Sequence, residues 1–234
     1  MPLKIYGMTA SPPVRLVLLT AEVLGLDYEF VEVNIDKSEQ LADDFLKLNP
    51  QHNIPVLQHD DFIMNESRAI AGYLVRTFDP NGNLYPIEPK IQARVDQRLL
   101  FDMGVTSRAI EDIIIPILFG RKLNKNDEVK KKELDKLKEA MNWMREMIQE
   151  TGYAAGTHDL TIADLNFLVS YSTIRDTKMV DTEEYEELEK YFKRLSKLIP
   201  NYEKANGEGS KLLGDHYIKM LSLDEAHSKH SSNK

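Results

Sequence analysis

The hydrophobic pattern of this chain changes character near residue 80, and this change limits the possible folds more than any other feature of the sequence. Before it, short apolar and β-branched runs alternate with helical patterns, whereas only helical spacing recurs after about residue 89. The chain has 234 residues, which suits one large or two small domains. We therefore predict an α/β N-terminal domain followed by an all-α helical C-terminal domain.

The first part of the chain predicts a strand–helix–strand unit. Residues 3–6 and 28–35 have the composition of strands, and apolar side chains recur between them every three or four positions, as in a helix. Ser11 directly before Pro12 and Pro13 marks the start of that helix, because serine caps a helix and proline fits its first turn. Two strands connected through a helix lie parallel.

A hairpin and a last helix complete this domain. Residues 39–48 are polar and helix-like, and residues 56–59 and 62–64 flank a two-residue acidic turn, which predicts an antiparallel pair. Glu66 and Ser67 then open a helix with one apolar face. The order β-α-β-α-β-β-α is a thioredoxin-like arrangement.

Turn residues at positions 79–83 mark the domain boundary. Thr161 and Asp164 have the spacing of a capping box at the start of a buried helix. The lysine run at 130–132 lies beside acidic residues, which favours a solvated helix face over a binding patch. The predicted divisions are a thioredoxin-like domain at residues 1–80, a linker at 81–89, a helical domain at 90–222 and a disordered tail at 223–234.

Charge and composition exclude several function classes. Thirty basic against thirty-eight acidic residues give a net charge of -8, so nucleic acid is a poor general partner. The chain has no cysteine, which excludes disulfides, cysteine-ligated metals and a cysteine nucleophile, and we expect no metal site. No apolar run is long enough to span a membrane. A cytoplasmic protein is the default expectation.

Ser11 is the first candidate for chemistry. Its usual role would be a helix cap and nothing more. The positive end of the helix dipole also lies here, and a thiolate at this point would be stabilised, so that its pKa would fall. Because the chain has no cysteine, that thiol would have to come from a ligand.

Two further sites accompany Ser11. His52, Asn53, Ile54 and Pro55 precede the hairpin, where a cis Ile54-Pro55 bond would expose the Ile54 backbone to an extended peptide, although an ordinary proline opening an edge strand is the simpler reading. Glu66, Ser67 and Arg68 begin a helix and would suit a ligand ammonium and a ligand carboxylate, or they form a plain helix start. Together the three sites match glutathione, a peptide with a thiol, an amine and two carboxylates.

Six motifs resemble those of cytosolic glutathione transferases of the insect delta/epsilon group. They occur in family order over about residues 3–220: SPPVR at 11–15, NPQHNIPVL at 49–57, ESRAI at 66–70, LYP at 84–86, FDMG at 101–104 and TIAD at 161–164. The resemblance implies a glutathione transferase fold, a homodimer, and conjugation of glutathione, as co-substrate, to hydrophobic electrophiles in detoxification.

The resemblance also implies residue roles. Ser11 activates the glutathione thiolate, His52 meets the glycine end with Asn53 beside it, and Ile54 pairs with the cysteinyl unit before a cis Pro55. Glu66, Ser67 and Arg68 hold the γ-glutamyl end, with Asp102 near that network. The hydrophobic acceptor site would lie along the first long helix of the second domain, at positions Ser107, Ile110, Ile115, Leu118 and Phe119.

Two departures from the family pattern and several rival functions remain. Gln40 stands where many delta members have a histidine, and Ile113, Ile114 and Ile115 replace a stretch that often contains tyrosines. A ligand-sequestering protein or an assembly module of the same fold are alternatives. Glutathione-dependent peroxidase, isomerase or dehydrohalogenase activity would start from the same thiolate.

Overall fold

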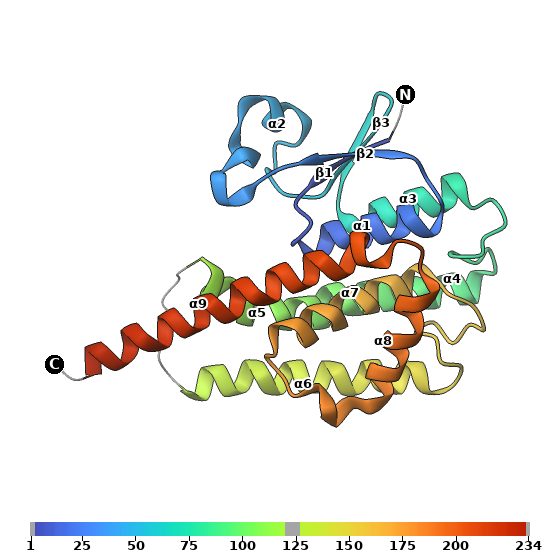
Figure 1. The fold of residues 1–234 in the computed structure, drawn as a ribbon. Helices are drawn as coiled ribbons and strands as arrows, with labels where there is room; N and C mark the ends of the chain where they lie inside the picture. Colours follow the sequence, from blue (N-terminus) through green and yellow to red (C-terminus); the bar gives the residue numbers. More distant parts are fainter. Residues whose placement is uncertain (1–2, 120–126, 233–234) are drawn as a thin grey trace.

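The structure is a computed structural model that describes residues 3–119 and 127–232. Its N-terminal part contains a four-stranded sheet in the order β2-β1-β3-β4 (Figure 1). β1 pairs parallel with β2 and antiparallel with β3, and β3 forms a hairpin with β4, so the predicted parallel and antiparallel pairs are confirmed. The strands are β1 (Leu3–Gly7), β2 (Tyr28–Glu32), β3 (Val56–His59) and β4 (Phe62–Asn65).

Helices cover both faces of this sheet, as a thioredoxin-like domain requires. α1 (Pro12–Val23) and α3 (Ser67–Phe78) lie on the side that faces the helical domain, and α2 (Asp43–Leu48) lies on the other side (Figure 1). Successive side chains of a strand point to opposite faces of the sheet, and each face has its own core. Ile5 packs with α1 and α3, whereas Val56 packs with Phe45 of α2. The predicted order of elements is confirmed.

Two predicted elements have different bounds in the structure. β2 ends at Glu32, because the Asn34 side chain accepts a hydrogen bond from the Lys37 amide and so opens the short 3-10 helix η1 (Ile35–Lys37). The polar stretch at 39–48 is not one helix but η2 (Glu39–Leu41) followed by α2.

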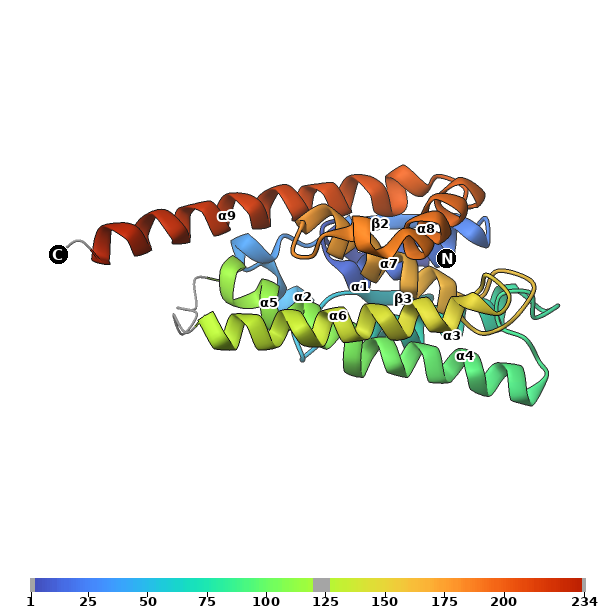
Figure 2. The same ribbon diagram turned by 90° about the horizontal axis from the view of Figure 1, so that it is seen from below.

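The rest of the described chain is helical, as predicted. α7 is central, and nearly all of its residues are buried, whereas α9 and α4 run along opposite edges of this domain in Figure 2. The elements are α4 (Pro89–Phe101), the π-helical turn η3 (Asp102–Thr106), α5 (Ser107–Leu118), α6 (Asp127–Gln149), α7 (Ile162–Thr177), the 3-10 turn η4 (Thr182–Tyr185), α8 (Glu186–Leu198), the π-helical turn η5 (Glu203–Gly207) and α9 (Glu208–Ser232).

The capping box at the start of α7 is confirmed. The fully buried Asp164 carboxylate accepts hydrogen bonds from the Thr161 amide and hydroxyl, both at 2.8 Å. It also accepts from the Ala154 amide at 2.7 Å and from the Tyr191 hydroxyl at 2.8 Å. One carboxylate therefore fixes the start of α7 to the preceding loop and to α8.

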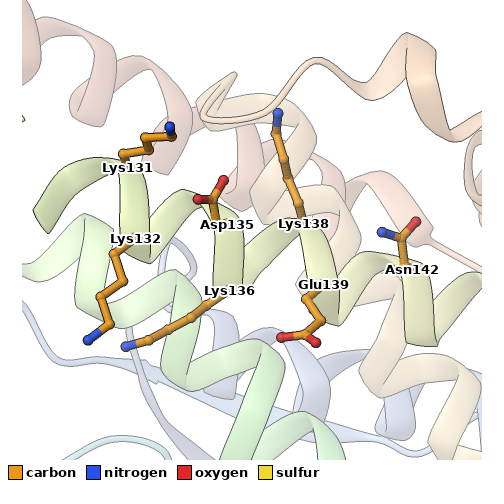
Figure 3. A pocket seen from close by; sticks show the side chains of 7 residues that line it. All are labelled: Lys131, Lys132, Asp135, Lys136, Lys138, Glu139 and Asn142. Atoms are coloured by element: carbon orange, nitrogen blue, oxygen red, sulfur yellow. The ribbon is translucent and has the colours of Figure 1, made fainter. Parts of the chain in front are cut away.

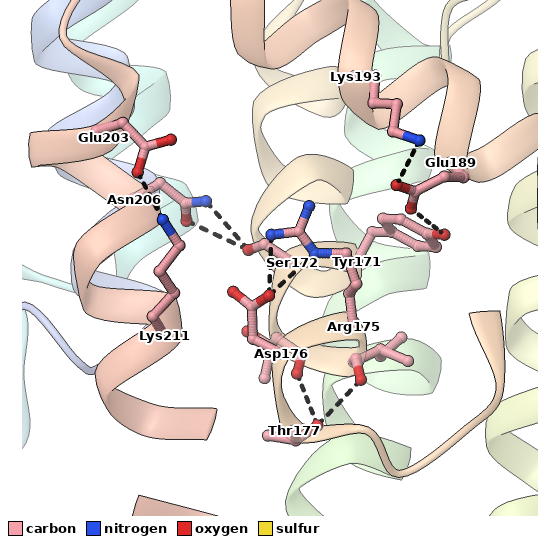
Figure 4. Close-up of polar contacts among 12 residues, drawn as sticks. Tyr171, Ser172, Arg175, Asp176, Thr177, Glu189, Lys193, Glu203, Asn206 and Lys211 are labelled. Atoms are coloured by element: carbon pink, nitrogen blue, oxygen red, sulfur yellow. Dashed lines mark hydrogen bonds and ion pairs between the residues drawn. The ribbon is translucent and has the colours of Figure 1, made fainter. Parts of the chain in front are cut away.

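A fully buried arginine joins the two domains. Arg15 of α1 donates to Ser172 Oγ at 3.0 Å, to Asn206 Oδ1 at 2.7 Å and to Thr173 Oγ1 at 2.6 Å. Figure 4 shows Asn206 of η5 beside Ser172 of α7. Burial lowers the pKa of Arg15 to about 10, so this guanidinium stays protonated at neutral pH.

The end of the chain differs from the sequence-based expectation of a disordered tail. α9 continues to Ser232 and projects past the other helices (Figures 1 and 2). Residues 223–232 contain no proline or glycine, and adding residues to an existing helix costs little free energy.

The lysine-rich segment of α6 lies on an exposed helix face. Lys131, Lys132 and Lys138 are exposed beside Asp135 (Figure 3), and Lys136 pairs with Glu133 at 2.8 Å. Lys130 lies outside the residues whose side chains are described. This mixed charge fits the predicted solvated face. Among the described residues, no helix combines the length and the apolar character needed to cross a membrane.

Candidate active site

A cavity of about 370 Å³ lies where α1 and α3 of the first domain meet α5, α7 and α9 of the second. Eight of the predicted site residues line it, from both domains: Ser11, Ser67, Arg68, Ser107, Ile110, Ile115, Leu118 and Phe119. The cavity therefore joins the predicted glutathione end and the predicted acceptor end of the site in one space.

Ser11 occupies the N-cap position of α1, as predicted. Its backbone is extended, but its side chain makes no capping hydrogen bond. Pro12 and Pro13 have no N–H, so the first residue of this helix that carries one is Val14. A helix start ordinarily leaves several backbone amides free, and the two prolines remove two of them here. The Ser11 hydroxyl is therefore an important donor that this helix end can offer to the cavity.

Arg68 is held by a carboxylate from the second domain. Its Nη2 donates to Asp102 Oδ2 and, at 2.8 Å, to Ser107 Oγ. Asp102 is fully buried in η3 and also accepts from Ser107 at 2.8 Å and from Ser170 of α7 at 2.6 Å. The resemblance placed Asp102 near this network, and the structure shows that its carboxylate orients the guanidinium.

The helix start next to Arg68 differs from the simplest sequence reading. α3 begins at Ser67, which is buried, and Glu66 rather than Ser67 is the N-cap residue. Glu66 is exposed and has a φ of 70°, a backbone conformation that non-glycine residues rarely adopt. A strained backbone conformation persists only where the surrounding packing holds it in place. Such conformations are common at ligand-binding positions.

The loop before β3 has the geometry that the sequence suggested. The Ile54-Pro55 peptide bond is cis, and β3 lies inside the sheet between β1 and β4, so Pro55 does not open an edge strand. His52 is exposed with a φ of 46°. Asn53 Oδ1 accepts from Asn65 at 3.1 Å, which ties this loop to the residue before Glu66.

Not every predicted residue reaches the cavity. Its lining does not include His52, Asn53, Ile54, Pro55 or Glu66, which lie on the neighbouring loop and helix start. Gln40, the departure from the family pattern, lies in η2, and its Oε1 is buried with no hydrogen-bond partner among the described residues.

The acceptor positions expected from the resemblance lie on α5. The π-helical turn η3 joins α4 to α5 with helical backbone angles at Phe101, Asp102 and Ser107, so the helix continues from α4 into α5 through a bulge. Ile110 and Ile115 lie on α5, and Phe119 is its C-cap residue, 55% exposed at the edge of the cavity.

Sequence reasoning missed part of the lining. α5 adds Ile114 and Glu111, and partial burial raises the pKa of the Glu111 carboxyl while Arg108 and Arg68 oppose that shift. The other missed residues on the helical domain come from α7 and α9: Asn166, Val169, Ser170, Leu212, Leu213 and His216. No local motif marks these positions, because only the packing of distant helices brings them to the cavity.

A thioredoxin-like domain joined to a helical domain, with a cavity between them, is the architecture expected of cytosolic glutathione transferases. Residues 5–82 match the family described as "Glutathione S-transferase, N-terminal domain". Glutathione S-transferase 1 of Manduca sexta is 34% identical over 95% of this chain and 100% of its own length.

Solved structures agree with this match. A Nilaparvata lugens delta-class glutathione transferase superposes with a TM-score of 0.87 and 35% identity, covering 94% of this chain and 100% of that one. An epsilon-class glutathione S-transferase from Musca domestica gives 0.85 and 33%, covering 93% and 98%. The chain belongs to the glutathione S-transferase family. The predicted fold and the resemblance to the insect delta/epsilon group are confirmed.

Proposed function

We propose that this enzyme conjugates glutathione to hydrophobic electrophiles in detoxification, with Ser11 as the residue that stabilises the glutathione thiolate. The observation that carries the proposal is the single cavity that has the Ser11 hydroxyl on one side and the apolar wall of α5 on the other. The reaction uses glutathione as co-substrate and no metal ion.

In this proposal the first domain holds the peptide. Arg68, fixed by Asp102, and Ser67 meet the γ-glutamyl carboxylate, because a guanidinium and a helix start both favour an anion, whereas the Glu66 carboxylate meets the γ-glutamyl ammonium. The Ile54 backbone, exposed by the cis bond, pairs with the cysteinyl unit. His52 and Asn53 lie at the glycine end, which leaves the thiol at α1.

Ser11 acts as a hydrogen-bond donor and not as a covalent nucleophile. The hydroxyl and the positive end of the α1 dipole stabilise the thiolate, which raises its population at neutral pH. The thiolate then attacks an electrophilic carbon held against Ile110, Ile115 and Leu118 of α5. The apolar side chains of this wall lower the local polarity, which strengthens electrostatic interactions beside them.

Replacement of Ser11 by alanine tests the assignment. We expect the apparent pKa of the bound thiol to rise and the rate at neutral pH to fall, because an important donor at this helix end is lost. The pH profile of kcat/KM for chlorodinitrobenzene, measured at saturating glutathione, reports both effects. If neither the profile nor the rate moves, the assigned role is wrong.

We also propose that the enzyme is a cytoplasmic homodimer. β4 is an edge strand that carries Phe62, 47% exposed, and α4 carries Leu100 near its end, 60% exposed. Exposed apolar groups of this kind favour burial against a second copy. Sedimentation at micromolar concentration should give twice the mass of one chain, whereas a single-chain mass would contradict the dimer. Cell fractionation tests the compartment.

A further inference from the structure

Glu111 is a charged residue on the otherwise apolar wall of α5, and the proposed mechanism gives it no role. The residues of α5 that line the cavity recur every three or four positions, so they form one face of the helix. They are Ser107, Ile110, Glu111, Ile114, Ile115 and Leu118. Glu111 lies in the middle of this face, one turn after Ser107 and one turn before Ile115. The residue is also exposed, so a ligand in the cavity can reach it.

The two arginines near Glu111 have other carboxylate partners. Arg108 pairs with Asp112 at 3.1 Å, and Arg68 pairs with Asp102 and also donates to Ser107. Both arginines attract the Glu111 carboxylate, which favours its charged form against the effect of partial burial. Within the described part of the chain, however, the Glu111 carboxylate makes no hydrogen bond or ion pair. Its charge is therefore available to a ligand.

The other charged groups of the cavity do not cancel this charge at α5. The described part of the lining contains one arginine, Arg68, one other carboxylate, Asp36 of η1, and one histidine, His216 of α9. Arg68 is paired with the buried Asp102 and, in the proposed function, meets the γ-glutamyl carboxylate of glutathione. The wall of α5 thus combines isoleucine and leucine side chains with one carboxylate. Such a surface favours a ligand that is hydrophobic and positively charged.

We propose that the Glu111 carboxylate selects electrophiles by charge, favouring hydrophobic electrophiles that carry a positive charge and disfavouring those that carry a negative one. The inference rests on the conjugation function proposed above. It deepens that function by naming a substrate class, cationic hydrophobic electrophiles, and a residue that determines specificity for it.

Glu111 takes no part in the bonds that change. In an aromatic substitution the thiolate electron pair forms the sulfur–carbon bond, and chloride leaves with the electrons of its bond to the ring. The carboxylate acts on the charged group of the electrophile by Coulomb attraction or repulsion, both on binding and during the attack. The effect therefore appears in kcat/KM for each charged electrophile.

Three electrophiles that share a chloronitrophenyl ring test the proposal at pH 8. They differ only in the group opposite the chloride: chloronitrobenzamide is neutral, chloronitrobenzoate is negative, and chloronitrophenyl-trimethylammonium is positive. For each enzyme, kcat/KM with a charged electrophile is divided by kcat/KM with the neutral amide. A general change in activity or in the packing of the ring cancels in these ratios.

Glu111→Gln removes the charge at nearly the same size. We expect the positive-to-neutral ratio to fall about three- to fivefold and the negative-to-neutral ratio to rise by a similar factor, the size of effect seen for exposed charge pairs. Glu111→Lys reverses the charge and should move both ratios further in the same directions. Both variants keep Ser11 and Arg68 unchanged.

Two controls separate this role from a structural one. Glu187→Gln removes the same charge from an exposed position of α8 outside the cavity lining, so both ratios should stay at the wild-type values. Sodium chloride at about 0.5 M should reduce the difference between wild type and Glu111→Gln, because salt screens an exposed charge. A purely steric effect of the substitution would not respond to salt.

Three results would overturn the inference. They are unchanged ratios in Glu111→Gln, the same change of ratios in Glu187→Gln, or a difference that salt does not reduce. If the wild type turns over none of the three electrophiles, the proposed function fails, and calorimetry with the same compounds decides about Glu111. Weaker binding of the positive compound alone by Glu111→Gln supports the inference, whereas equal binding or no binding refutes it.

Discussion

Gly209 lies in the first turn of α9 and packs directly against the backbone of Thr9, in the turn that leads to Ser11. A Cβ at position 209 would lie 2.7 Å from the carbonyl carbon of Thr9, closer still to its oxygen, and 3.2 Å from Cδ of Arg15. The main obstacle is backbone, so no change of rotamer can relieve it. We predict that Gly209→Ala displaces the turn that positions Ser11, the residue proposed to stabilise the thiolate.

The size of this displacement follows from the contact distances. Ordinary van der Waals contacts begin at 3.4 Å, so α9 and the Thr9 carbonyl must separate by at least ~0.7 Å. Overpacking of this kind costs about 1–3 kcal/mol of stability. A shift approaching 1 Å near a reacting group can lower a rate by about a hundredfold. We therefore expect kcat/KM to fall between about ten- and a hundredfold.

The matched control is Gly104→Ala, because a Cβ at position 104 meets no heavy atom within 4 Å. Initial rates with chlorodinitrobenzene and urea unfolding should be measured for both variants. Gly104→Ala should keep the wild-type rate, and its stability should match or exceed that of the wild type, because alanine favours a helix more than glycine does. If Gly209→Ala also keeps both, α9 does not position the Ser11 turn and the reasoning fails.

Three other substitutions test the polar contacts that hold the site and the domains. Asp102→Asn removes the charge that fixes Arg68, so the glutathione Kd from calorimetry should rise about tenfold, and an unchanged Kd would contradict the pairing. Asp164→Ala leaves buried donors of its loop and of Tyr191 without an acceptor. It should lower the free energy of unfolding by about 3–5 kcal/mol in urea, and a loss below about 1 kcal/mol would show that water replaces the carboxylate. Arg15→Met deletes three hydrogen bonds but also a desolvated charge, so we expect a smaller loss of about 2–4 kcal/mol, and equal or greater stability would mean that the charge costs more than its bonds contribute.

The parts of the fold that the sequence predicted correctly depend on signals a few residues long. A serine followed by two prolines, a two-residue acidic turn and the spacing of Thr161 and Asp164 each determine local backbone geometry. Ile91, Val95, Leu99 and Met103 recur every four residues, which indicates one face of a helix. Val95 and Leu99 are buried, but Met103 is 47% exposed, because periodicity identifies a helix face and not what covers it.

The parts that the sequence could not predict depend on distant contacts. Asn166 and His216 reach the cavity only because α7 and α9 pack beside α1 and α5, and nothing next to them in the chain indicates this. The Glu66 backbone conformation was missed for a similar reason. A positive φ at a non-glycine residue is imposed by surrounding packing and opposes the local preference.

The buried arginine of α1 has a consequence for the autonomy of the two domains. α1 packs against α3 on one side and against α7 on the other, and among the described residues the hydrogen-bond acceptors of the Arg15 guanidinium, Ser172, Thr173 and Asn206, all belong to the helical domain. A separated N-terminal domain would expose an apolar helix face and would leave its guanidinium without the groups that solvate it. The two sides of residue 80 thus differ in architecture, but they do not unfold independently. The chain should unfold in one cooperative transition.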